Sequence, residues 1–112
     1  VALSQMNIEA VGEMERLAPF GAGNARPLFA SRRVEMAGPP HPVGGNGRHV
    51  AFLLKDGPTV MRGIGFGMGS AYEELAGVRG PIRVAFHPKI DVWGGSRKVE
   101  LEIKDIEIVD RL

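Results

Sequence analysis

From residue 28 onward, apolar and polar residues alternate in short segments, which is the pattern of half-buried β-strands. In residues 48–55, for example, Val50, Phe52 and Leu54 share one face. Gly and Pro separate the alternating segments, and Asp56-Gly57 is a strong hairpin signal between two of them. The pattern predicts five strands, over residues 28–37, 48–55, 59–66, 81–92 and 98–109.

The alternation in the last segment changes phase before the segment ends. Val99, Leu101 and Ile103 lie on one face, whereas Ile106 and Ile108 have the opposite parity. One additional residue in the strand would restore both groups to the same face. We therefore predict a β-bulge near Asp105.

Two segments show helical signals instead. Ile8, Val11, Met14 and Leu17 recur every three residues after Asn7, a good N-cap, and Pro19 ends that helix. A second, short helix is expected between the third and fourth strands. A capping box begins at Ser70, and Gly77 suits the end of the helix. Val1 to Gln5 is expected to be a short strand.

This order of elements is the chain path of a mostly β protein, a five-stranded OB-fold barrel preceded by an N-terminal helix. Three strands, a short helix and two strands follow one another in that fold. Barrels of this kind often bind single-stranded nucleic acid or oligosaccharide. Binding is therefore the first functional hypothesis.

Length and composition limit the kinds of protein to which this sequence can belong. A chain of 112 residues is long enough for one domain, and no apolar run is long enough to span a membrane. Cysteine is absent, which excludes disulfides and thiolate metal sites and fits a cytoplasmic location. The net charge is +1, so contacts to phosphates would depend on local clusters of basic residues.

Basic residues on the predicted strands are the first candidates for nucleic-acid binding. OB folds commonly bind across strands 2 and 3, between two flanking loops, which here are residues 38–47 and 93–97. The alternative is a solvated face without a partner, and for Arg48 and Arg62, on strands 2 and 3, neither interpretation is favoured. The candidates are Arg32, Arg33, Arg48, Arg62, Arg83, Arg97 and Lys98.

Aromatic residues offer a second kind of contact, because bases stack on their rings. Trp93, beside Gly94 and Gly95, could stack on a base or cap the core. His49 could contact a base or phosphate, or be structural. The remaining aromatic residues on strands alternate with the apolar set and are expected in the core; they are Phe52, Phe66 and Phe86.

The glycine-rich loop over residues 19–27 has two interpretations. Gly21, Gly23 and Asn24 could present backbone N–H groups to a phosphate. They could also form a tight connection between the helix and the barrel, since these residue types are usual turn formers.

No catalytic or metal-binding constellation is visible. The only histidines are His41, His49 and His87, and none lies beside a carboxylate pair. Glu100 and Glu102 alternate onto the outer face of the last strand, where a solvated acidic stripe is expected. Such a stripe would repel DNA and direct binding elsewhere.

The segment from Leu17 to Phe29, LAPFGAGNARPLF, resembles the junction before the OB domain of RecJ-type exonucleases. Those enzymes degrade single-stranded DNA in the 5′ to 3′ direction, and their pattern is roughly L-x-P-F-G-x-G-N-P-x-P-x-F. The sequence departs from it at Ala25, where proline is usual. Similar segments follow downstream at 47–49, 56–57, 64–66, 93–94, 99–101 and 104–106.

The resemblance implies an OB domain over residues 28–112, with residues 1–27 leading in from a preceding domain. The family's metal-dependent catalytic machinery, which uses Mn²⁺ or Mg²⁺, lies in two upstream domains and has no counterpart here. The implied role is to bind single-stranded DNA without cutting it, in DNA repair and recombination. The implied partners are DNA, the preceding nuclease domains and other repair proteins. The alternative is a structural or protein-interaction module that braces the nuclease or docks a repair protein.

Overall fold

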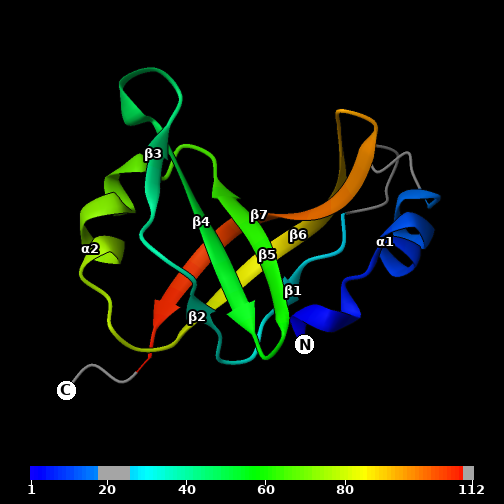
Figure 1. Cartoon of the computed structure of the whole chain (residues 1–112), viewed down its shortest axis with the longest axis horizontal. Helices are drawn as coiled ribbons and strands as arrows, with labels where there is room; N and C mark the ends of the chain where they lie inside the picture. The colour runs from blue at the N-terminus through cyan, green and yellow to red at the C-terminus, as the bar shows by residue number, and fades with distance from the viewer. Residues whose placement is uncertain (18–25, 110–112) are drawn as a thin grey trace.

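The alternating segments form one curled β-sheet accompanied by two α-helices and short 3-10 turns (Figure 1). This computed structural model describes residues 1–17 and 26–109. Its elements, in chain order, are η1 (Leu3–Gln5), α1 (Ile8–Glu15), β1 (Phe29–Ala30), β2 (Glu35–Met36), β3 (His41–Val43), η2 (Gly45–Gly47), β4 (His49–Asp56), β5 (Thr59–Gly65), η3 (Gly69–Ala71), α2 (Tyr72–Ala76), β6 (Ile82–Trp93) and β7 (Ser96–Ile108).

The first predicted strand, over residues 28–37, is present as two short pieces at opposite ends of the sheet. The strand order is β1-β6-β7-β5-β4-β2, with β3 also paired to β4. Because β1 and β2 follow each other closely in the chain, the two ends of the sheet must approach one another. The sheet is therefore curled, mostly antiparallel and consistent with an OB-like fold.

Two further segments differ from the prediction. β3 pairs with β4 inside the segment 38–47, which was expected to be a loop. Residues 1–5 were expected to be a strand, but residues 3–5 form the turn η1 instead. The Gln5 side chain accepts a hydrogen bond from the Ala2 N–H at 2.8 Å, which favours the turn over an extended chain.

The predicted bulge is confirmed on β7. Ala85 of β6 faces Asp105, whereas the next residue, Phe86, faces Ile103. Lys104 is therefore the additional residue on β7, one position from the predicted place. The bulge returns Ile106 to the apolar side of the strand, where it packs against the core.

Two of the three predicted core phenylalanines are confirmed. Phe52 and Phe86 are buried, but Phe66 is 49% exposed, so its predicted place in the core is wrong. Gly63 takes the inward position on β5, because a Cβ there would lie 3.0 Å from the Ile103 side chain and 3.6 Å from Phe52. Phe66 has the opposite parity and points outward.

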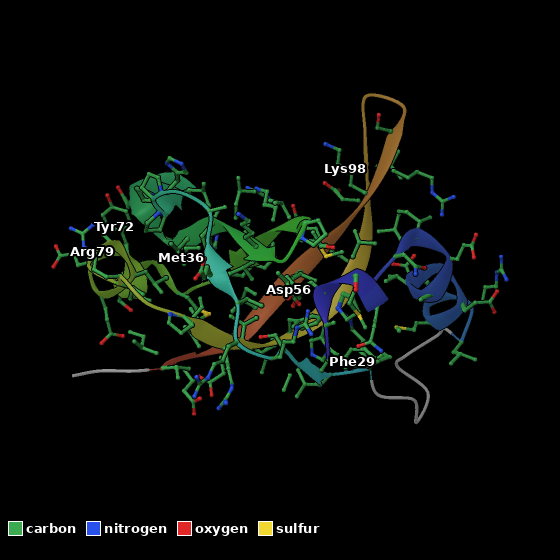
Figure 2. All side chains as sticks on the ribbon, turned by 60° about the horizontal axis from the view of Figure 1, so that its bottom comes forward. Phe29, Met36, Asp56, Tyr72, Arg79 and Lys98 are labelled. Atoms are coloured by element: carbon green, nitrogen blue, oxygen red, sulfur yellow. The ribbon has the colours of Figure 1, made fainter. Side chains whose placement is uncertain are left out.

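A buried carboxylate fastens the N-terminal segment to the sheet. Asp56, at the end of β4, accepts a hydrogen bond from the buried N–H of Leu3 at 2.9 Å and pairs with Arg32 at 2.8 Å. Figure 2 shows Asp56 directly beside the N-terminal turn. The hydrogen bond from Arg32 lowers the pKa of Asp56 below its usual value, and burial of the carboxylate opposes this only in part.

We expect Asp56→Ala to lower the free energy of unfolding by about 1–3 kcal/mol, because the Leu3 N–H loses its acceptor. The lowered pKa means that this contribution is complete above the unfolded-chain pKa of aspartate, about 3.9, and is lost as the pH falls further. Urea unfolding of both proteins at several pH values measures it. The difference between them is expected to shrink below about pH 4, and a difference independent of pH would contradict the assignment.

Candidate nucleic-acid interface

The outer face of β4, β5, β7 and β6 brings several sequence candidates together. Facing residues of paired strands lie on the same side of a sheet, so Leu53 and Arg62 share this face, as do Glu100 and Lys89. Phe66 follows the last residue of β5, and its ring lies at this face, because the Lys89 ammonium is 5.7 Å from its centroid. His49, at the start of β4, also contributes its ring, which contacts Phe66.

Phe66 is the centre of the aromatic part of this face. The His49 ring meets it edge-on, with 5.4 Å between centroids and an interplanar angle of 73°. The Lys89 ammonium lies 5.7 Å from the Phe66 centroid, within cation–π range. His49 Nδ1 accepts a hydrogen bond from the Gly67 N–H at 2.8 Å, so Nε2 carries the hydrogen of the neutral ring. An exposed aromatic ring with adjacent donors suits a nucleobase and its phosphate.

Arg48 adds a cation next to His49. It follows η2, and its carbonyl accepts a hydrogen bond from the Gly69 N–H at 2.9 Å, which holds its backbone against η3. Its side chain is exposed. Within residues 1–17 and 26–109, the Arg48 guanidinium has no ion-pair partner, so it is free to bind an anion.

The predicted solvated acidic stripe on β7 is wrong. Glu100 is only 8% exposed, and its carboxylate pairs with Arg62 and, at 3.9 Å, with Lys89. Glu102 pairs with Arg26 at 3.0 Å and with Lys104 at 3.6 Å. Both carboxylates lie on the outer face, but basic side chains cover and neutralise them.

The local charges also set the ionisation of Glu102. Burial raises the pKa of the carboxylate, but the hydrogen bond and charge of Arg26, together with Lys104, outweigh burial and leave the pKa lowered. The stripe is therefore an ion-pair network, and we do not expect it to repel DNA as free carboxylates would.

The other predicted site residues lie elsewhere or outside the described parts. Arg32 is engaged by Asp56, and Arg33 is exposed between β1 and β2. Arg97 faces Val92 in the β6–β7 hairpin, and Figure 2 shows that this hairpin, which carries Lys98, projects from the rest of the sheet. Outside the described residues and side chains are Gly21, Gly23, Asn24 and the side chain of Trp93.

A groove of about 970 Å³ adjoins the same face. β5 and β7 pair only at Gly63 and Ile64, so the first half of β5 separates from the β6–β7 hairpin. The start of α1, β5 and the hairpin form the walls. Val60 and Leu53 contribute apolar surface, and the lining also includes Arg62, Asp91, Lys98 and Glu100.

Sequence reasoning missed Phe66 and Lys89 as binding candidates. For Phe66 a signal was present, because the hairpin at Asp56-Gly57 fixes which residues of β4 and β5 face each other.

Among the described residues, no group of three or more His, Asp or Glu side chains is placed to hold a metal ion. In the same part of the chain, no helix is long and apolar enough to cross a membrane.

A family model and one curated relative match this chain by sequence. A family model described as the RecJ OB domain matches residues 1–105. The single-stranded-DNA-specific exonuclease RecJ of Bacillus subtilis (strain 168) is 25% identical over 107 residues, which are 95% of this chain and 13% of that protein. The chain therefore spans only a small part of its relative.

Two solved structures share the fold. RecJ from Thermus thermophilus, in complex with Mg²⁺, matches with a TM-score of 0.65 and 22% identity, over 99% of this chain and 16% of that one. A protein described as an aspartyl-tRNA synthetase from Leishmania major Friedlin matches with a TM-score of 0.59 and 10% identity, over 97% of this chain and 20% of that one. Since the family model covers nearly the whole sequence, this chain belongs to the RecJ OB-domain family.

Proposed function

We propose that this chain is the single-strand-binding domain of a RecJ-type exonuclease and holds a DNA strand for a catalytic centre in other domains. Two findings support the proposal: the chain's family, and the name of its Bacillus subtilis relative, which states specificity for single-stranded DNA. The observation that carries it is the exposed Phe66 ring with His49 and Lys89 around it.

Each part of this cluster has a separate role in the proposed complex. A base stacks on Phe66, a contact that every base can make, so the binding is largely independent of sequence. Lys89 and Arg48 bind the phosphates on either side of that base. A duplex keeps its bases stacked inside, so it offers Phe66 no base face and binds more weakly.

We expect Arg48→Gln to weaken single-strand binding about tenfold at low salt, because one charge-assisted phosphate contact is lost. The slope of log K against log salt becomes less steep by about 0.7, the value for one phosphate contact to a single strand. Fluorescence anisotropy with labelled single-stranded and duplex oligonucleotides, over a salt series, measures both effects.

Arg83→Gln is the matched control for this prediction. Arg83 pairs with Glu107 at 3.0 Å, both side chains are largely exposed, and both lie beyond the β7 bulge. The substitution removes the same charge away from the proposed site. Equal affinities of the two variants would contradict the role of Arg48, and equal binding of duplex and single strand would contradict the role of Phe66.

A protein-docking role is the second candidate, and the groove beside β5 favours it. Leu53 and Val60 expose apolar surface there, which suits an apolar segment of another domain or repair protein. Val60→Asp distinguishes the two functions, because it places a charge in the groove while leaving the Phe66 cluster intact. If the chain binds no oligonucleotide at any salt concentration, and if Val60→Asp weakens the full-length enzyme's thermal stability, docking is the function.

A further inference from the structure

We infer that Glu100 is a built-in competitor of the nucleic-acid phosphates, which limits the affinity of this domain for a strand. The inference rests on the proposed function and adds to the same surface a residue that opposes strand binding. Binding would exchange the carboxylate of Glu100 for phosphate at the basic side chains around it, in an ordinary equilibrium without covalent chemistry.

The geometry places Glu100 between two basic residues of the outer face. Its Oε2 accepts a hydrogen bond from the Arg62 guanidinium, and its Oε1 lies 3.9 Å from the Lys89 ammonium. Lys89 is at the same time 5.7 Å from the Phe66 ring centroid. One carboxylate therefore holds both cations, and one of them, Lys89, also contacts the aromatic ring on which a base would stack.

The burial of these groups decides which of them can move. The Glu100 side chain is 11% exposed, whereas the Arg62 and Lys89 side chains are 45% and 34% exposed. The carboxylate is fixed in the sheet surface, and the long cationic side chains can turn toward solvent. A phosphate that draws them away leaves a nearly buried carboxylate without partners, which costs free energy.

The consequence is an affinity lower than the number of basic residues suggests. Arg62 and Lys89 have a counterion that belongs to the protein, so a strand releases fewer salt ions when it binds them. A single strand bound to such cations dissociates more readily than one bound to cations without a protein counterion. Easy release suits a domain that must pass a strand along its surface to a nuclease, because a tightly held strand could not advance.

Glu100→Gln tests the inference, with Glu107→Gln as the matched control. Both glutamates lie on β7 and pair with an arginine on another strand, and both substitutions change the net charge equally. Glutamine keeps the size of the side chain and can still accept a hydrogen bond from Arg62. Affinity for a labelled single-stranded oligonucleotide is measured by anisotropy at several salt concentrations, and thermal unfolding checks the fold.

We expect Glu100→Gln to bind about 3- to 10-fold more tightly than the unmodified chain and Glu107→Gln to bind nearly as the unmodified chain does. The salt slope of Glu100→Gln becomes more negative by about 0.7 to 1.4, corresponding to one or two newly available cations. Adding Arg62→Gln to Glu100→Gln removes part of this gain. Glu100→Asp withdraws the charge by one methylene group and gives an intermediate increase, so it serves as the test if Glu100→Gln is unstable.

The possible results separate the inference from the proposed function. If the unmodified chain binds the strand and Glu100→Gln binds no more tightly than Glu107→Gln, Glu100 is only structural and the inference is overturned. If neither the unmodified chain nor any variant binds, both the inference and the proposed function are overturned. Tight binding by Glu100→Gln and weak binding by the unmodified chain would support both.

Discussion

Phe66→Ala is expected to weaken the binding of single-stranded DNA by about 5- to 150-fold, because removing an aromatic ring that stacks on a base costs about 1–3 kcal/mol. Phe66 is 49% exposed, so the substitution removes little core packing and the melting temperature should change only slightly. The salt slope should stay nearly constant, since stacking releases no counterions. Anisotropy and thermal unfolding on the same samples measure both quantities.

Two further substitutions identify the cause of this loss. Phe66→Tyr keeps the ring and should keep the affinity within about threefold, whereas Phe66→Leu keeps apolar surface but loses the π-face and should behave like alanine. Leu28→Ala removes an exposed apolar side chain elsewhere, since Leu28 is 58% exposed and precedes β1. If Leu28→Ala weakens binding as much as Phe66→Ala does, Phe66 has no particular place in the site.

The outward position of Phe66 can be derived from the sequence once the hairpin register is applied. In β4, the apolar alternation assigns Val50, Phe52 and Leu54 to the core, and all three are buried. The turn pairs Asp56 with Thr59, so Phe52 faces Gly63 and Val50 faces Gly65. Facing residues share a side of the sheet. Gly63 and Gly65 therefore face the core, and Phe66, which has the opposite parity, lies on the outer side, although its alternation with the apolar residues predicted a place in the core.

The ion-pair network on β7 could not be derived in the same way. Alternation places Glu100 and Glu102 on the outer face correctly, but their burial depends on side chains from other segments. Arg26 comes from the loop before β1, and Arg62 comes from β5, which runs parallel to β7. The spacing of charges along one strand contains no information about these partners.

The division of the first predicted strand into two pieces could not be derived from local alternation either. Its residues have strand propensity, but β1 pairs with β6 and β2 pairs with β4, so the chain must change partners between them. Ser31 lies in this interval and binds β6, with its N–H donating to the Val84 carbonyl and its hydroxyl accepting from the Val84 N–H. These contacts extend the β1–β6 pairing by one residue beyond Ala30. They arise from tertiary structure, which local alternation does not describe.

Gly69→Ala is expected to destabilise the protein by about 3 kcal/mol, the upper end of the usual cost of overpacking. A methyl group on Gly69 would lie 1.9 Å from the Gly47 carbonyl oxygen and 2.8 Å from the Arg48 carbonyl carbon. Both neighbours are backbone atoms, so no side-chain rotation relieves the contact. η3 must move away from η2, and the hydrogen bond from the Gly69 N–H to the Arg48 carbonyl is lost.

The matched control is Gly45→Ala, in η2 itself, where an added Cβ meets no atom within 4 Å. Urea unfolding should show a loss of stability for Gly69→Ala and little change for Gly45→Ala. Because the same contact holds the backbone before His49, the folded Gly69→Ala protein should also bind single-stranded DNA more weakly. Equal stability of the two variants would show that the two turns are not packed as described. A destabilised protein with unchanged DNA affinity would instead show that Arg48 and His49 do not depend on η3 for their position.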